Sequence, residues 1–351
     1  MVIEPRRATS ADVAARAGVS RTTVSFVLND RPGANISSAT RERVFAAATE
    51  LGYHAHASAR TLAVGKSHTL GLVLRQSAEQ VASDQLLAET LRGLVTAARA
   101  ATYRVLVEPL MPGDGVFIDL LRSRRADGLV ISGPRVDDPG LADLTFDGFP
   151  IVLQGSLPGV EIPSVDVDNM TGARGAVEYL LRTGHRRIAC ITNAPLEYTA
   201  ARERRDGYRA ALEANGIAYV ESLVVQAAFD AASGSRAMTE LLARTTFDAV
   251  FVASDVVALG AIGALRRAGL RVPTDVSIVG FDDIALAAFF DPPLTTVHVP
   301  AYDLGLAAGR ALLDRIGGRP VPSRTLLPTE FVVRSSTADR RALSAVGGPA
   351  P

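Results

Sequence analysis

The 351-residue chain has one cysteine and no long apolar run. Cys190 alone cannot form a disulfide within the chain or a cysteine metal cluster, so no metal is expected and a reducing compartment is favoured. The N-terminus has no apolar signal core, and no uninterrupted apolar stretch reaches the roughly 18 residues that a membrane-spanning helix needs. Secretion and membrane insertion are therefore not indicated, and the predicted location is the cytoplasm.

Signatures of common enzyme classes are also missing. The sequence has no GxxxxGK[ST] phosphate loop, no HExxH zinc motif and no GxSxG nucleophile elbow. Gly260 and Gly263 lie within a helical pattern, whereas a dinucleotide fingerprint would follow a strand. His185 precedes a predicted strand, and nothing suggests a nucleophile beside it. We therefore predict that the chain is not an enzyme and uses no cofactor.

Charge is balanced over the whole chain but not along it. The sequence has 37 basic and 37 acidic side chains. Residues 1–66 hold nine of the basic and five of the acidic ones, a net charge of +4, which leaves −4 on the remainder. Lys66 is the only lysine, so the many arginines reflect coding bias more than function. A basic end on an acidic body predicts that a polyanion binds at the N-terminal end.

Residues 12–29 predict two short helices joined by a tight turn at Gly18, with Ser20 as the cap of the second helix. Apolar residues at helical spacing form the expected buried faces, which are Val13, Ala14 and Ala17, then Val24, Val27 and Leu28. An ordinary helical hairpin is the alternative. The second helix, however, leaves a polar face that suits base edges and phosphates in a major groove. The residues assigned to this DNA interface are Thr9, Ser20, Arg21, Thr22, Thr23, Ser25, Phe26 and Asn29.

Two further segments complete the N-terminal part. Residues 39–51 predict a third helix, with Ser37 or Ser38 as its cap and Gly52 as its stop. Residues 53–66 are rich in alanine and short of core-forming side chains, so a helix there would be marginal without a partner. This second segment is interpreted as a hinge.

From residue 69 onward, apolar runs alternate with helical patterns. The runs are LGLVL, YRVLVEPL, DGLVISG, PIVLQG, RIACIT, SLVVQA, AVFVAS and VSIVGFDD. This alternation is typical of βαβ units with a parallel sheet. The number of units exceeds what one sheet normally carries, which predicts two similar doubly wound lobes. Such lobes bind small ligands in a cleft outside the carboxyl ends of their strands.

The motifs of the first 62 residues, taken together, resemble the DNA-binding head of the LacI/GalR family of bacterial transcription regulators. The run from Thr9 to Leu62 carries the resemblance, through Ile36-Ser37, Thr40-Arg41, Leu51-Gly52-Tyr53 and Ala59-Arg60. Weaker likeness continues to about Thr337. The implied fold class is α/β, with a three-helix helix-turn-helix head and two doubly wound lobes of the periplasmic sugar-binding type.

The resemblance also implies a division of the chain. Its parts are a helix-turn-helix head at residues 1–52, a hinge helix and linker at 53–67, an effector-binding domain at 68–337, and a disordered tail at 338–351. The two lobes of the effector-binding domain are expected near 69–165 plus 298–327 and near 166–297 plus 328–337. The tail has no heptad pattern, so the tetramerising extension of some family members is not visible.

An effector site in the cleft is likewise implied. Arg204, three residues before Gly207-Tyr208, matches the arginine that clamps the effector, and a guanidinium can grip hydroxyls or a carboxylate. A solvated helix residue is the alternative. Asp282 matches a second polar clamp, with a helix cap as its alternative. Phe229 matches an aromatic that stacks on the ligand, although a core phenylalanine is nearly as good an interpretation.

The chain departs from the family at two cleft positions. Ser254-Asp255 stands where many members have Asn-Asp, and Gln154 stands where an aspartate commonly ends the strand. The cleft should therefore carry fewer charges than in some relatives. Arg75 and Asp168 are further candidates for effector binding.

The predicted function is effector-controlled transcription regulation, most often repression in this family. A homodimer would read a near-palindromic double-stranded operator, and a sugar or similar polar metabolite would bind between the lobes. The hinge is implied to fold on DNA and to insert Leu62 into the minor groove, with Ala59 as a further DNA-binding residue, although Ala55 and His56 replace the usual Pro-Asn. A plain sugar-binding protein would instead show a signal peptide and no basic head, and a sugar-modifying enzyme would need a reactive group in the cleft.

Overall fold

The computed structural model describes residues 8–28, 33–53, 66–110, 117–138, 141 and 148–341. The chain divides into an N-terminal unit and a larger unit that begins at Thr69. Within the described ranges, no helix is both long and apolar enough to cross a membrane.

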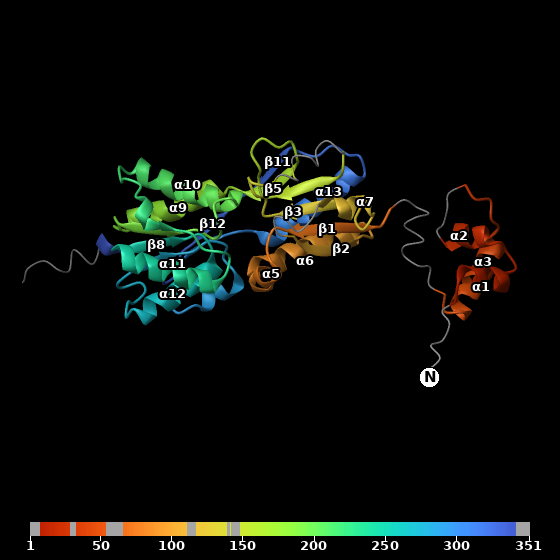
Figure 1. The fold of residues 1–351 in the computed structure, drawn as a ribbon, viewed down its shortest axis with the longest axis horizontal. Coiled ribbons are helices and arrows are strands. Elements are labelled where there is room, and N and C mark those ends of the chain that lie inside the picture. Colours follow the sequence, from red (N-terminus) through yellow and green to blue (C-terminus); the bar gives the residue numbers. More distant parts are fainter. Residues whose placement is uncertain are drawn as a thin grey trace, which may run out of the picture. The chain divides into compact units, whose positions relative to one another are not determined.

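In its described residues, the N-terminal unit forms a head of three helices, α1 (Ser10–Ala17), α2 (Arg21–Leu28) and α3 (Ser38–Glu50) (Figure 1). Each helix begins at a hydroxyl cap. The Thr9 hydroxyl accepts a bond from the Asp12 amide, whose side chain bonds back to Thr9 as a capping box. Ser20 and Ser37 cap α2 and α3 in the same way. Gly18 ends α1 with a φ of 64°, a left-handed conformation that glycine adopts without strain.

The head has its own small core. Val13, Val24 and Val44, one from each helix, have at most 1% of their surface exposed. Small side chains fill the space around them, namely Ala14, Ala17, Val27, Ala47 and Ala48. The predicted helix-turn-helix and third helix are therefore confirmed.

The first lobe of the larger unit is a six-stranded parallel sheet in the order β11-β5-β4-β3-β1-β2. Its strands are β1 (Thr69–Leu74), β2 (Arg104–Pro109), β3 (Gly128–Ser132), β4 (Ile151–Gln154), β5 (Ser164–Val167) and β11 (Arg324–Leu327). Its helices are α5 (Ala78–Ser83), α6 (Gln85–Ala100), α7 (Phe117–Arg122) and α13 (Ala301–Ile316). Alternate residues of β1 pack on opposite faces of the sheet. Leu72 joins the core with Leu94 of α6, and Val73 joins the core with Leu121 of α7.

The second lobe has a four-stranded parallel sheet in the order β7-β6-β8-β9. Its strands are β6 (Ile188–Ile191), β7 (Val224–Val225), β8 (Ala249–Val252) and β9 (Ser277–Val279). Its helices are α9 (Asn169–Arg182), α10 (Thr199–Ala214), α11 (Ala231–Arg244) and α12 (Asp255–Arg267), with short 3₁₀ turns at η1 (Glu221–Leu223) and η2 (Ala285–Phe289). An antiparallel pair, β10 (Thr296–His298) and β12 (Glu330–Val332), is linked to β9 by a bridge from Val279 to Thr295. The predicted two-lobed α/β fold is confirmed.

The chain passes between the lobes three times, after β5, after β10 and after β11. β5 belongs to the first sheet up to Val167, so the first crossing comes slightly later than predicted. The polar residues that follow the carboxyl ends of the strands in both lobes line a shared cleft, as expected of doubly wound sheets.

The tail begins later than predicted. The structure holds residues 338–341 against the second lobe. The Ala338 amide donates to the Ser277 hydroxyl at 3.0 Å, and the Arg340 amide donates to the Thr183 carbonyl at 2.9 Å. These bonds tie the backbone down, so the predicted disorder is wrong for these four residues. Residues 342–351 lie outside the described part of the chain.

Candidate functional site

Helix α2 carries the predicted DNA-contacting residues of the head. Val24 and Val27 are buried, so the opposite side of the helix faces outward. Arg21 and Thr22 are exposed in its first turn, and Thr23, Ser25 and Phe26 are partly exposed. Ser20 and Thr9, which were also predicted to contact DNA, cap α2 and α1. The remaining predicted contacts, Asn29, Ala59 and Leu62, lie outside the described residues.

A cavity of about 160 Å³ lies in the cleft of the larger unit. Both lobes contribute polar side chains to it. Those of the first lobe include Gln76, Asp84, Ser132, Gln154 and Asp166, and those of the second include Asn193, Tyr198, Arg204, Ser254 and Asp282. Phe229 adds an aromatic ring to this lining. The structure thus brings together five of the seven predicted effector residues, Gln154, Arg204, Phe229, Ser254 and Asp282.

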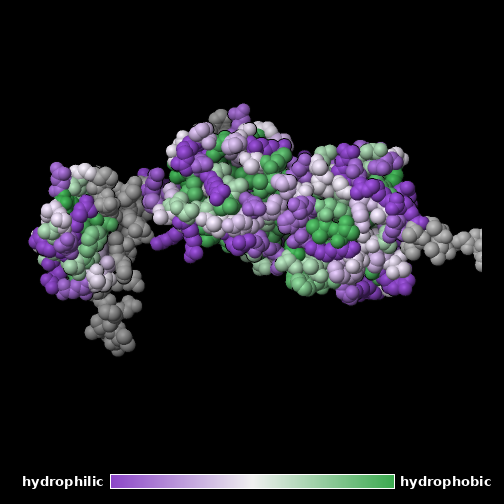
Figure 2. Space-filling view, turned by 180° about the vertical axis from the view of Figure 1, so that it is seen from behind, coloured by the Kyte–Doolittle hydropathy of each residue, from purple (hydrophilic) through white to green (hydrophobic). Residues whose placement is uncertain are grey.

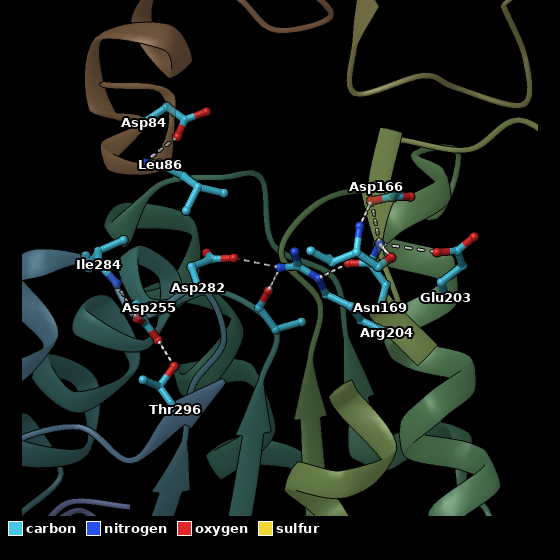
Figure 3. A network of polar contacts seen from close by, with 12 residues as sticks. Asp84, Leu86, Asp166, Asn169, Glu203, Arg204, Asp255, Asp282, Ile284 and Thr296 are labelled. Carbon is cyan, nitrogen blue, oxygen red and sulfur yellow. Dashed lines mark hydrogen bonds and ion pairs between the residues drawn. The ribbon is translucent and has the colours of Figure 1, made fainter. Parts of the chain in front are cut away.

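Arg204 is the centre of the polar network in the cleft (Figure 3). Its Nε donates to Asn169 Oδ1 at 2.9 Å, and its Nη1 donates to the Ala253 carbonyl at 2.7 Å and to Asp282 Oδ1 at 3.0 Å. The guanidinium carbon also lies 3.8 Å from the centre of the Phe281 ring. Only 6% of Arg204 is exposed. These contacts fix the guanidinium plane beside the cavity.

Asp282 lies beyond β9 with a φ of 115°, a backbone conformation that costs a residue with a side chain roughly 1–3 kcal/mol. Its amide donates to the Val297 carbonyl and its carbonyl accepts from Val299, so the surrounding strands hold it there. Burial raises the pKa of Asp282 to about 6, although the Arg204 charge acts in the opposite direction. The strained backbone aims the carboxylate at Arg204, and this placement does not match the alternative interpretation as a helix cap.

Two more carboxyl groups, those of Asp166 and Glu203, lie on the side of Arg204 away from Asp282 (Figure 3). Asp166 Oδ1 accepts bonds from the Val167 amide and, at 3.2 Å, from Asn169 Nδ2. Asn169 Nδ2 also lies 3.2 Å from Glu203 Oε2 (Figure 3). Burial, and next the charge of Glu203, raise the pKa of Asp166 to about 7. The carboxyl group of Asp166 is therefore partly protonated near neutral pH.

Asp255 lies outside the cavity and stabilises the backbone next to it. Its side chain is fully buried and accepts the Thr296 hydroxyl at 2.6 Å and the Ile284 amide at 3.0 Å. Burial, followed by the charge of Asp282, raises its pKa well above the ordinary value. Asp255 is not among the residues that line the cavity. It holds the segment after Asp282 in place.

Phe229, Ser254 and Gln154 complete the set of predicted residues that line the cavity. Phe229 has a φ of 68°, and its ring meets that of Tyr198 edge-on at 4.9 Å between centroids. Ser254 precedes α12 and forms no cap bond to it. Gln154 ends β4, and its Nε2 lies 3.4 Å from the Thr90 hydroxyl.

Two predicted effector residues have other positions. Arg75 forms a buried ion pair with Asp138 at 2.8 Å and does not line the cavity. Asp168 caps α9 by accepting the Thr171 amide at 2.9 Å, and it too is absent from the lining. The structure thus gives both residues a structural role outside this cavity, and effector contact by either stays a prediction. One is a structural ion pair and the other a helix cap.

Sequence reasoning missed Gln76, Asp166, Asn169 and Asn193. All four line the cavity, and each lies at or within two residues of the carboxyl end of a strand. A uniform search for polar residues after predicted strands would have found them. No group of three or more metal-binding side chains occurs in the described ranges.

Comparisons with known proteins agree with both units. The sequence pattern of bacterial regulatory proteins of the lacI family matches residues 9–56, and that of the periplasmic binding protein-like domain matches residues 177–337. The HTH-type transcriptional regulator CelR of Thermobifida fusca is 38% identical over 94% of this chain and 98% of its own length. The ribose operon repressor of Escherichia coli (strain K12) is 34% identical over 94% of this chain and all of its own length.

Solved structures give the same result. The complex of CelR with cellobiose has a TM-score of 0.71 and 37% identity, covering 94% of this chain and 100% of that chain. The lac repressor dimer bound to operator and the anti-inducer ONPF has a TM-score of 0.80 and 30% identity, covering 95% of this chain and 100% of that chain.

Proposed function

This chain belongs to the LacI family of bacterial regulatory proteins, and from that membership we propose that its cleft binds an uncharged, hydroxyl-rich effector of the sugar class. The chain is a sequence-specific DNA-binding transcription regulator of the repressor type. Its relatives include a regulator solved with cellobiose and a repressor of a ribose operon.

One observation carries the effector class. Among the residues that the structure describes, four buried oxygens of the cavity lining find no hydrogen-bond partner, namely Gln76 Oε1, Gln154 Oε1, Asp166 Oδ2 and Asn193 Oδ1. A buried polar group without a partner costs about 1–3 kcal/mol. The three amide oxygens accept, and Asp166 Oδ2 accepts or donates according to its protonation, so the matching ligand is one with several O–H groups, which offer donors and can also accept. A sugar with hydroxyls around its ring supplies them.

Charge limits the choice further. The cavity lining contains three carboxyl groups, Asp84, Asp166 and Asp282, against one guanidinium, Arg204. Asp282 already pairs with Arg204 at 3.0 Å. A phosphorylated or carboxylate effector would add negative charge to a buried site that has no spare cation among the lining residues. An uncharged effector avoids that desolvation and repulsion.

The DNA-binding half of the proposal rests on α2. Arg21 and Thr22 lie exposed at its N-terminal end, where a recognition helix meets base edges first. A homodimer would place two such helices on a near-palindromic operator, as in the dimeric lac repressor complex. DNA contact by Ala59 and insertion of Leu62 into the minor groove remain predictions.

Two further parts of the proposal rest on the relatives. They are transcription regulators, and the described residues that line the cavity include no cysteine or histidine. We therefore include the absence of catalysis in the proposal. A location in the cytoplasm follows from binding to chromosomal DNA.

Titration calorimetry with the full chain tests the effector class. Cellobiose, ribose and glucose are compared with glucose 6-phosphate, which keeps the ring and adds charge. We expect at least one uncharged sugar to bind and the phosphate ester not to bind. The binding sugar should also change the mobility-shift affinity for DNA that flanks the protein's own coding region. Tight binding of the phosphate ester alone would refute the proposed effector class.

A further inference from the structure

A set of contacts apart from the Arg204 network joins the two lobes. Residues 133–138 follow β3 in the first lobe, and residues 195–199 follow β6 in the second. The Val136 amide donates to the Glu197 carbonyl at 2.9 Å, and the Thr199 amide donates to the Pro134 carbonyl at 3.2 Å.

An isolated antiparallel bridge links Arg135 with Tyr198 at the centre of this pairing. Neither segment belongs to the three crossings between the lobes, so chain connectivity does not impose the contact. It has to break when the lobes separate.

Tyr198 is the side chain at the centre of this contact. It belongs to the second lobe, is 4% exposed, and donates its hydroxyl to the Arg75 carbonyl of the first lobe. The Arg135 guanidinium lies 4.7 Å from the centre of its ring. Arg75 is itself fixed by the buried ion pair with Asp138. The tyrosine of one lobe is thus anchored in a rigid part of the other.

The same ring supports the cleft. Phe229 meets Tyr198 edge-on, with 86° between the ring planes, and its amide donates to the Asn193 carbonyl at 2.8 Å. Ala194 and Ala201 pack beneath the two rings. Phe229 also lines the cavity. A ligand that contacts Phe229 therefore acts on the position of Tyr198, the residue that connects the two lobes.

We propose that Tyr198 is a latch between the lobes, a positioning residue that holds them closed and connects Phe229 to the first lobe. Effector contact with Phe229 stabilises the tyrosine in its interlobe position, so occupancy of the cleft and closure of the lobes favour each other. The link to the effector rests on the proposed function. The latch itself does not, because its contacts are formed by the chain alone.

A variant without the Tyr198 hydroxyl tests the contribution of this one hydrogen bond between the lobes. Tyr198→Phe keeps the ring on Phe229 and Arg135 but removes the bond to the Arg75 carbonyl. A buried hydrogen bond of this kind contributes a net stabilisation that corresponds to a change of about twofold to tenfold in an equilibrium constant. We expect the ratio of open to closed protein to rise by that factor.

Tyr208→Phe is the matched control. Tyr208 is fully buried and donates its hydroxyl to the Ile188 carbonyl at 2.8 Å, but both residues belong to the second lobe. The two substitutions remove the same chemical bond, one across the lobes and one within a lobe. A purely structural role for Tyr198 would give both variants the same behaviour.

Spin labels on Ala78→Cys and Ala232→Cys report the distance between the lobes by pulsed electron resonance. Both alanines are exposed, one on α5 of the first lobe and one on α11 of the second. Cys190 does not compete for the label, because it is buried and burial raises its pKa to about 12.

In ligand-free protein we expect a longer-distance population that grows in Tyr198→Phe and not in Tyr208→Phe. Identical distance distributions in both variants would overturn the latch. Calorimetry with the sugar that binds the parent should show weaker binding to Tyr198→Phe by the same twofold to tenfold, with Tyr208→Phe unchanged. If no sugar binds the parent, the proposed function fails, and the ligand-free distances still decide the latch.

Discussion

Arg204 is a structural tie within the second lobe, and under the proposed function it is also the ligand clamp. Its contacts reach Asn169, Ala253 and Asp282, which come from three different elements of the second lobe. The pair with Asp282 is buried, and breaking a buried pair by removing one partner costs about 3–5 kcal/mol. A variant of this residue therefore tests ligand binding only if its folding is measured as well.

Arg204→Lys keeps the positive charge but replaces the planar guanidinium, with its several fixed donors, by a single ammonium group. We expect effector affinity to fall by about tenfold to a hundredfold, since a charge-assisted bond contributes roughly 1.5–3 kcal/mol. Operator affinity without effector should match the parent. Arg205→Lys is the control, because Arg205 pairs with Asp206 and does not line the cavity. Calorimetry and mobility shifts measure both, and equal effector affinity in the two variants would exclude Arg204 as the clamp.

Asp166 predicts a pH dependence of stability. Its folded pKa of about 7 lies above the ordinary value of 3.8, so the folded protein binds the proton more tightly than the unfolded chain. The contribution of Asp166 to stability is complete below about pH 4 and is lost as the pH rises to 7. Asp166→Asn mimics the protonated form. We expect its melting temperature to be close to the parent's at pH 4, to exceed it slightly at pH 5 and to exceed it by a few °C at pH 8.

Glu203→Gln provides the comparison for that experiment. Glu203 is the second cause of the raised pKa of Asp166, so its neutralisation should move the parent's loss of stability to lower pH without removing it. A constant difference between Asp166→Asn and the parent from pH 5 to pH 8 would show that Asp166 does not titrate in this range.

Asp166 and Asp168 also show the limit of reasoning from sequence. The two acids are two positions apart in the sequence, a spacing that would put both on one side of a strand. The strand ends at Val167, however, and Asp168 turns away to cap α9. The ion pair of Arg75 was not predictable for another reason, because its partner Asp138 is 63 positions away. Residue roles that depend on where a strand stops, or on distant partners, do not follow from local pattern.

At the scale of elements, helix pairs in both lobes meet through glycine. A Cβ on Gly260 of α12 would lie 1.7 Å from the Ala231 carbonyl oxygen of α11. Gly234 of α11 makes the reciprocal approach to Val257. The dinucleotide fingerprint was excluded for Gly260 from its helical setting, and close helix packing now explains the residue.

Gly260→Ala should therefore destabilise the second lobe. The added methyl overpacks a backbone contact, which typically costs about 1–3 kcal/mol. Gly263, three residues on in the same helix, has only the Arg267 guanidinium within 4 Å of such a methyl, at 3.5 Å. Gly263→Ala should be neutral or stabilising by about 0.5–1 kcal/mol. Urea unfolding compares the two, and equal effects would contradict the packing explanation.

Helix α2 allows a test of the DNA-binding assignment. Replacing Arg21 and Thr22 together should change the half-site that the protein selects from a randomised DNA pool, because base contacts carry sequence information. Arg43 of α3 is also exposed and supplies the control. Arg43→Ala should lower affinity at most, and equally for all sequences. An unchanged selected half-site in the α2 variant would assign Arg21 and Thr22 to the phosphate backbone.

At the scale of the whole molecule, the fold was predictable because its signals are local and repeated. The apolar runs RIACIT and AVFVAS form β6 and β8, as the alternation of runs and helical patterns predicted. The sharing of strands between lobes was implied by resemblance alone. β11 joins the first sheet beside β5, although 156 residues separate Val167 from Arg324.

One surface feature of the second lobe bears on assembly. Phe289 is 83% exposed, the largest value among the exposed large apolar side chains, and Leu259 and Leu286 are 45% and 49% exposed. A hydrophobic patch surrounded by hydrophilic residues is visible on this lobe in Figure 2. Exposed apolar patches of this kind mark protein interfaces. A homodimer, as proposed for operator binding, would cover such a residue.

Phe289→Glu should weaken the dimer at least about 30-fold, because loss of a buried aromatic anchor from an interface costs 2 kcal/mol or more. Val220→Glu is the control, since Val220 is also an exposed apolar residue of the second lobe, at 40%. Sedimentation should find Phe289→Glu monomeric at concentrations where the parent and Val220→Glu are dimers. The monomer carries one head and loses the avidity of two half-sites, so operator affinity should fall while effector binding in the cleft persists. Dimers of unchanged stability in Phe289→Glu would place the self-interface on another face of the molecule.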